Sequence, residues 1–178
     1  MGEPVIADEI VAVVTAIHAA PQRLVYLFAG AGSMALWWLH AVAGSSRTVL
    51  EAIDAYTPEA LHSYLSTASS SAVSVETAHG MAAWAQQRAR ALGGDLGVGL
   101  TAAIATDRER RGANRCIVAI HHAQGRACHE LRMHKGARER LAEEELVSRT
   151  VLHAIAVGCG VRVPTIALLP GEQLVEHR

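Results

Sequence analysis

The chain has 178 residues, of which 51% are hydrophobic, 19% charged and 4% aromatic, and its formal net charge at pH 7 is -1. This length suits one domain with a single core, and the composition excludes both a disordered chain and a strongly basic nucleic-acid-binding surface. The apolar runs 24–28 and 34–39 are far shorter than the about 20 residues that span a bilayer. We therefore expect a cytoplasmic globular protein that binds neither nucleic acid nor membranes.

The cysteines and histidines give no sign of a metal site. Cys116, Cys128 and Cys159 are odd in number and lack the C-x-x-C spacing of a zinc site. His121 and His122 are neighbours on a predicted strand, so their side chains point to opposite faces and do not easily share a metal ion. We expect free thiols, no disulfide framework, no metal and no cofactor.

The first segments read as a helix, a strand and a second helix. Apolar residues recur at helical spacing over residues 4–19, and Pro21 closes that segment. The strand-forming run 24–28 leads through Gly30-Ala31-Gly32-Ser33 into an apolar helix over 34–42. Residues 48–56 fit either a helix or a strand, and their periodicity does not decide between the two.

Capping residues mark the next two helices. Thr57 and Pro58 suit the N-cap and first position of a short helix that reaches about residue 65. A serine-rich loop over 66–71 follows. Ser74 then caps a helix with an alanine-rich apolar stripe, which ends at Gly93-Gly94.

The second half of the chain reads as strands followed by a long helix. The apolar runs 96–105, 115–123 and 126–133 predict three strands, with Gln124-Gly125 as the hairpin connection and Ala123 opposite Arg126. The segment 138–157 predicts an amphipathic helix. We place Val147, Val151, Ala154 and Ile155 on its buried side and Glu143, Glu144 and Arg149 on its solvent side.

These elements predict an α/β fold in which helices are layered around a mixed β-sheet. Residues 1–163 form the expected domain, and residues 164–178 form an expected C-terminal tail or linker.

The glycine loop is the strongest candidate site in the sequence. Gly30, Gly32 and Ser33 lie between a strand and a helix, where free backbone amides bind phosphate. The same residues equally suit a tight turn in which Ser33 caps the helix. The arginines within 108–111 fit either a phosphate contact or a solvated loop, and Arg138 fits either an anion contact or the start of a charged helix face.

The ordered motifs of the chain resemble the C-terminal domain of the CinA family, which includes nicotinamide mononucleotide deamidases. The resemblance covers about residues 5–160 and implies an α/β fold, a homodimer, a nucleotide bound at the glycine loop and hydrolysis of the nicotinamide amide. The residues that carry it are Val42-Ala43-Gly44-Ser45-Ser46, Tyr56 with Glu59-Ala60, Ala72-Val73-Ser74 with Met81, and Lys135-Gly136-Ala137-Arg138.

The chain departs from this family at the positions that carry the chemistry. Active members have Glu-Ser-Cys-Thr-Gly-Gly after the first strand, and the position of its serine nucleophile here is Ala29. The position of the family's basic lysine is Leu61, whereas the tyrosine is kept as Tyr56 and the arginine of the Gly-Asp-Arg signature as Arg138. Loss of nucleophile and base removes transition-state stabilisation, but phosphate contacts from amides and arginine survive such changes.

We therefore expect a divergent CinA-like pseudoenzyme that binds a nicotinamide-type nucleotide or another phosphorylated ligand. Two alternatives stay open: an active amidohydrolase with a relocated site at Ser33 and Tyr56, and a structural or regulatory dimerisation module of a larger protein. The expected ligand-binding residues are Gly30, Gly32, Ser33, Ser45, Ser46, Tyr56 and Arg138.

Overall fold

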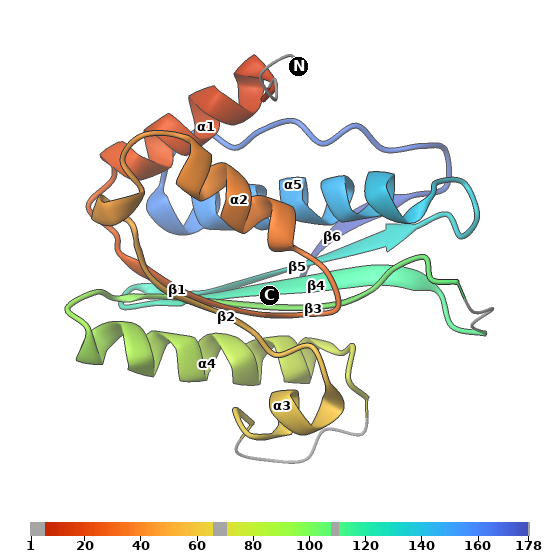
Figure 1. The fold of residues 1–178 in the computed structure, drawn as a ribbon, viewed down its shortest axis with the longest axis horizontal. Coiled ribbons are helices and arrows are strands. Elements are labelled where there is room, and N and C mark those ends of the chain that lie inside the picture. The colour runs from red at the N-terminus through yellow and green to blue at the C-terminus, as the bar shows by residue number, and fades with distance from the viewer. Residues whose placement is uncertain (1–5, 66–70, 108–110, 178) are drawn as a thin grey trace.

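The computed structural model describes residues 6–65, 71–107 and 111–177. Within them, six strands form one mixed sheet in the order β2-β1-β3-β4-β5-β6, sandwiched between two layers of helices (Figure 1). The first three strands of that order are parallel, and the others join through antiparallel pairs. This arrangement confirms the predicted α/β fold. The strands are β1 (Leu24–Ala29), β2 (Val49–Asp54), β3 (Leu96–Ala103), β4 (Asn114–His122), β5 (Gly125–Met133) and β6 (Gln173–His177).

The helices cover both faces of the sheet. Helices α1 (Asp8–Ala19), α2 (Ser33–Ala41) and α5 (Arg140–Cys159) lie on one face, and α3 (Pro58–His62) and α4 (Val75–Ala91) lie on the other (Figure 1). Strand β1 is buried along its whole length because helices cover both of its faces. No helix of the described ranges is long and apolar enough to cross a membrane.

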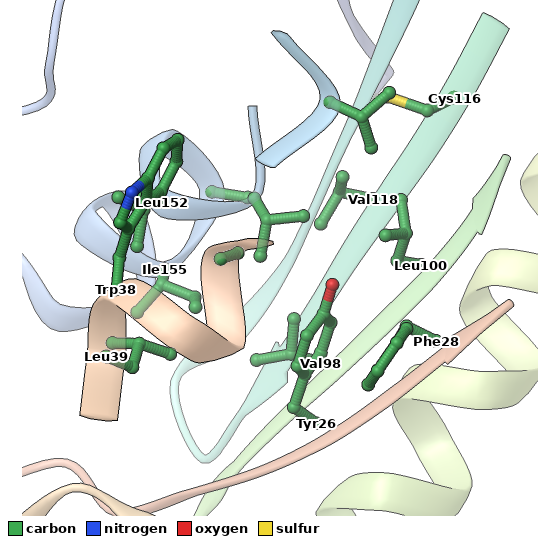
Figure 2. Close-up of a cluster of buried hydrophobic side chains, with 14 of the residues drawn as sticks. Tyr26, Phe28, Trp38, Leu39, Val98, Leu100, Cys116, Val118, Leu152 and Ile155 are labelled. Carbon is green, nitrogen blue, oxygen red and sulfur yellow. The ribbon is translucent and has the colours of Figure 1, made fainter. Parts of the chain in front are cut away.

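The larger core fills the space between the sheet and helices α1, α2 and α5 (Figure 2). Tyr26 and Phe28 stack there with ring centroids 4.6 Å apart. Trp38 of α2 and Leu152 of α5 close the core from the helix side. This packing fixes α2 and α5 next to each other, and the glycine loop enters α2 at its first residue.

Most predicted elements are confirmed, since local signals determine them. Ser74 accepts a hydrogen bond from the Thr77 amide at 3.0 Å and caps α4, and Thr57 caps α3 in the same way. The ambiguous segment 48–56 contains strand β2. Two ends differ from prediction, because α3 stops at His62 and the described part of the first helix begins at Asp8. The predicted start at residue 4, loop residues 66–70 and residues 108–110 lie outside the described residues.

The predicted hairpin register is wrong by two residues. His122 pairs with Gly125, so Ala123 and Gln124 form the connection and Gly125 begins β5. Neither connecting residue has a positive φ, and glycine is favoured at the position after the two central residues of a common β-turn. A shift of two residues keeps every side chain on its predicted face.

The three cysteines are free and buried, as expected. Burial raises the pKa of Cys116 and of Cys159 to about 12 and that of Cys128 to about 11. Thiols with such pKa values are unreactive near neutral pH, because the thiolate is the nucleophilic form.

The beginning of α5 differs from its predicted character. The helix starts at Arg140 rather than at 138, and Glu143 is fully buried instead of facing solvent. Glu143 packs against the ends of β3 and β4, where a backbone amide and Asn114 donate to its carboxylate. The expected tail 164–178 contains β6, which pairs with β5 and completes the sheet.

Candidate functional site

The candidate site lies at the carboxyl ends of the parallel strands β2, β1 and β3. The helix after β1 covers one face of the sheet, whereas α4, which leads into β3, covers the other (Figure 1). Ligands of open α/β sheets bind in the crevice beyond the strand ends where the connections diverge in this way. The loop after β1 lies at this end of the sheet.

Two glycines shape this loop. Gly30 has φ +88°, and a Cβ placed there would be 2.1 Å from the carbonyl oxygen of Ala102 on β3. Gly32 has φ +99°, and its Cβ would be 2.2 Å from a methyl group of Leu100. The Tyr26 hydroxyl donates to the Gly32 carbonyl at 3.1 Å and holds the loop from below. Only glycine fits both positions without a shift of the neighbouring backbone or side chains.

A carboxylate of the same chain accepts hydrogen bonds from the donors of the loop. Gly32 N–H donates to both oxygens of Glu144, at 2.9 and 3.0 Å, and Met34 N–H donates to Oε1 at 3.0 Å. The Ser33 hydroxyl lies 3.2 Å from the same oxygen. Ser148, one turn further along α5, donates to Glu144 and accepts from the Ala35 amide. The start of α2 is thus capped by α5 rather than by its own Ser33.

The charge of the Glu144 carboxylate also raises the pKa of two neighbouring groups. Desolvation and then the charge of Glu144 raise the pKa of Asp54, which ends β2. Burial and, next, Glu144 raise the pKa of the Tyr26 phenol well above its ordinary value, so Tyr26 stays a neutral hydrogen-bond donor.

A second internal carboxylate joins α5 to the strand ends. Glu143 accepts from the Ala105 amide at 2.6 Å and from Asn114 Nδ2 at 2.8 and 3.0 Å. Arg140 donates to the Ala105 carbonyl at 2.9 Å. Sequence reasoning missed this contact, because a run of three glutamates at a helix start is typical of a solvated face.

Arg138 is engaged by the C-terminal segment. Its guanidinium forms an ion pair with Glu172, which is buried and also accepts from the amides of Leu169 and His134 at 2.8 and 3.1 Å. Burial alone would raise the pKa of Glu172, but Arg138 and these two amides outweigh it and hold the pKa below its ordinary value. Arg138 thus fastens the segment before β6 to the start of α5.

The expected ligand-binding residues fall into separate places. Tyr56 follows β2 at the same edge as the glycine loop, and its side chain is 64% exposed. Ser45 and Ser46 lie in a single 3-10 turn before β2, at the opposite end of the parallel strands. Ser45 there pairs with His40 Nδ1 at 2.7 Å. The structure therefore places Tyr56 and the loop at the carboxyl end of the parallel strands and both serines at the opposite end.

The two positions that the sequence resemblance matches to a nucleophile and a base, Ala29 and Leu61, lie in the core. Ala29 is 7% exposed and Leu61 is 4% exposed, and both belong to the apolar cluster between β1 and α4. Val25, Leu27 and Met81 belong to the same cluster. Alanine and leucine side chains carry no group that acts as a nucleophile or a base.

A separate polar pocket of about 400 Å³ lies near β5 and β6, on the α4 face. His79, Arg126 and His177 line it, and His79 Nδ1 is 2.8 Å from His121 Nε2. Burial lowers the pKa of His121 to about 4, with His79 as the next cause. Among the residues that the structure describes, no three His, Cys, Asp or Glu side chains are placed to hold a metal ion.

Several solved structures share this architecture. The competence/damage-inducible protein CihA from Agrobacterium tumefaciens superposes with a TM-score of 0.70 at 23% identity, over 89% of this chain and 98% of the other. A CinA superfamily protein from Klebsiella pneumoniae gives 0.70 at 16% identity, over 86% and 96%. One from Enterobacter cloacae gives 0.69 at 14% identity, over 89% and 96%. This chain has the CinA fold.

The CinA likeness holds for the fold and spans most of the described chain. No family model matches the sequence, and no curated protein matches it either. The resemblance drawn from the motifs is thus confirmed as a structural likeness at low sequence identity.

Proposed function

We propose that this CinA-fold protein binds a phosphorylated ligand, such as a nicotinamide-type nucleotide, without deamidating it. The observation that carries the first part is the glycine loop, whose amide and hydroxyl donors converge on one anionic group. Helix N-termini preceded by glycine-rich loops are ready-made sites for phosphate oxygens. Gly30, Gly32, Ser33 and Tyr56 form this proposed site.

The absence of deamidase chemistry is supported by Ala29 and Leu61. Amide hydrolysis by a covalent route needs a nucleophile and a base within hydrogen-bond reach of each other. In this chain both corresponding side chains are apolar and packed in the core. Backbone donors do not depend on those side chains, so ligand binding is compatible with their loss.

The test is incubation of the pure protein with nicotinamide mononucleotide, with ammonia release and binding heat followed in parallel. Binding without release is the expected result. Absence of binding at millimolar nucleotide would overturn the proposal, and ammonia release at enzymatic rates would overturn its non-catalytic part. The variant Tyr56→Ala, which removes a side chain of the proposed site, should weaken binding without creating activity.

A second candidate function follows from the contact between Ser33 and Glu144. A hydroxyl 3.2 Å from a carboxylate oxygen is an arrangement that serves general-base activation of a nucleophile. This candidate predicts ammonia release that Ser33→Ala abolishes. Turnover that survives Ser33→Ala would exclude Ser33 as the nucleophile.

The homodimer stays a prediction of the resemblance and of the apolar α2. Trp37 on this helix is 44% exposed, which leaves a large apolar side chain for a second copy to cover. Light scattering on a size-exclusion column gives the oligomeric state directly. A monomer at high micromolar concentration would contradict the prediction.

A further inference from the structure

The glycine loop has a ligand within its own chain. The donors of Gly32, Ser33 and Met34 all point to the carboxylate of Glu144, which lies 110 to 112 positions away in the sequence. We infer that Glu144 is an internal competitor that must leave these donors before an external oxoanion binds. This inference rests on the proposed site and adds its regulation.

Competition follows from the chemistry of the two groups. Carboxylate and phosphate oxygens use the same N–H and O–H donors, and both are favoured at a helix N-terminus. Gly32 N–H already donates to both Glu144 oxygens, so an external anion finds this donor only after the side chain moves. The two anions would also repel each other at contact distance.

The surroundings of Glu144 make it a removable ligand. Within the described ranges, no arginine, lysine or histidine forms an ion pair with its carboxylate, and its side chain is half-buried. Asp54 lies near enough for the charge of Glu144 to raise its pKa. Displacement therefore breaks hydrogen bonds to the loop and requires no separation of an opposite charge.

Arg138 is likewise paired with a carboxylate of its own chain. This arginine, which the resemblance assigns to ligand binding, is paired with Glu172 of the C-terminal segment. Both donor groups expected to meet an external anion thus carry a carboxylate of the same chain. Each of the two groups therefore has to lose an internal carboxylate before it can meet an external anion.

The experiment is a titration with inorganic phosphate, followed through the backbone amide signals of Gly32 and Met34 in a nitrogen–proton correlation spectrum. The variants are Glu144→Ala and, as a matched control, Glu145→Ala, which removes the same charge from the next position on α5. We expect Glu144→Ala to bind phosphate about tenfold or more tightly than wild type, a factor typical of coupled binding equilibria. Glu145→Ala should behave as wild type.

Acetate provides a second arm, because it replaces the missing carboxylate. Acetate should shift the same two amides in Glu144→Ala and should lower the apparent affinity for phosphate there. If Glu144→Ala does not fold, Glu144→Gln keeps the side-chain size, removes the charge and is expected to bind phosphate more tightly than wild type as well.

The outcomes separate the inference from the proposed function. Equal phosphate affinity in wild type and both Glu144 variants, or no shift of the two amides in any of them, would overturn the inference whatever the nucleotide does. Tighter phosphate binding in the variants, together with no nucleotide binding by wild type, would support the inference and overturn the proposed function.

Discussion

Replacement of Glu143 with alanine should destabilise the fold far more than replacement of Glu145, two positions further along the same glutamate run. The Glu143 carboxylate is fully buried and accepts three hydrogen bonds, one from the Ala105 amide and two from Asn114 Nδ2. Alanine removes the acceptor of both donor groups, of which Asn114 is buried and Ala105 partly buried. A buried donor that loses its partner costs about 1–3 kcal/mol of folding free energy. Removal of the buried charge returns part of that cost, so we expect a net loss of about 2–4 kcal/mol.

The assay is urea denaturation followed by circular dichroism, with Glu145→Ala as the control. Glu145 is partly exposed and pairs with Arg149 at 3.0 Å, so its loss should cost no more than about 1 kcal/mol. Hydrogen exchange at the Ala105 amide should accelerate in Glu143→Ala alone. A loss of stability no larger than that of the control would refute the reasoning, because it would show that the buried contacts contribute nothing beyond a surface pair.

Three further predictions concern the loop, the C-terminal segment and the histidine pair. Gly30→Ala should lower the free energy of unfolding by about 2 kcal/mol or more, because φ at this position is positive and the new Cβ would lie 2.1 Å from a carbonyl oxygen of β3. Gly112→Ala is the control, since its Cβ would have nothing within 4 Å, and it should leave thermal unfolding unchanged. The pKa of Glu172 is lowered in the fold, so its pair with Arg138 should stabilise the folded protein at pH values above the ordinary glutamate pKa. This stabilisation should be lost as the pH falls below that value. A stability difference between wild type and Glu172→Gln that stays constant from pH 7 to pH 3 would contradict the prediction. The pKa of His121 is lowered to about 4 in the fold, so the unfolded chain binds this proton at a higher pH than the folded protein does. The free energy of unfolding should therefore decline as the pH drops from about 6.5 toward 4. His121→Gln should reduce this decline in denaturation curves measured at several pH values.

The elements that the sequence predicted correctly depend on signals within a few residues. Ser74 and Thr57 mark helix starts because a side chain caps an amide three positions later. The strand–glycine–helix unit was also readable, since its glycines and apolar runs are contiguous. The hairpin register failed because the glycine was assigned to the centre of the turn, while the chain uses it one position later.

The occupant of the candidate site was not readable from the sequence. Glu143 and Glu144 were assigned to solvent because carboxylates on a helix usually face water. Their burial depends on where the first turn of α5 meets the ends of β1 and β3, which only the assembled sheet determines. The pairing of Glu172 with Arg138 was not predicted for the same reason. The two residues are 34 positions apart, and the segment between them includes the whole of α5.

Strand β6 has a consequence for self-association of the chain. It covers one edge of β5, a nine-residue strand whose Cys128, Glu130 and Leu131 are buried. Release of the segment held by Arg138 would uncover that edge and present unpaired backbone groups to other chains, the geometry from which intermolecular strand addition and aggregation start. The paired state ends the sheet instead with a five-residue strand that exposes Gln173 and Glu176, a short and polar edge that discourages such addition.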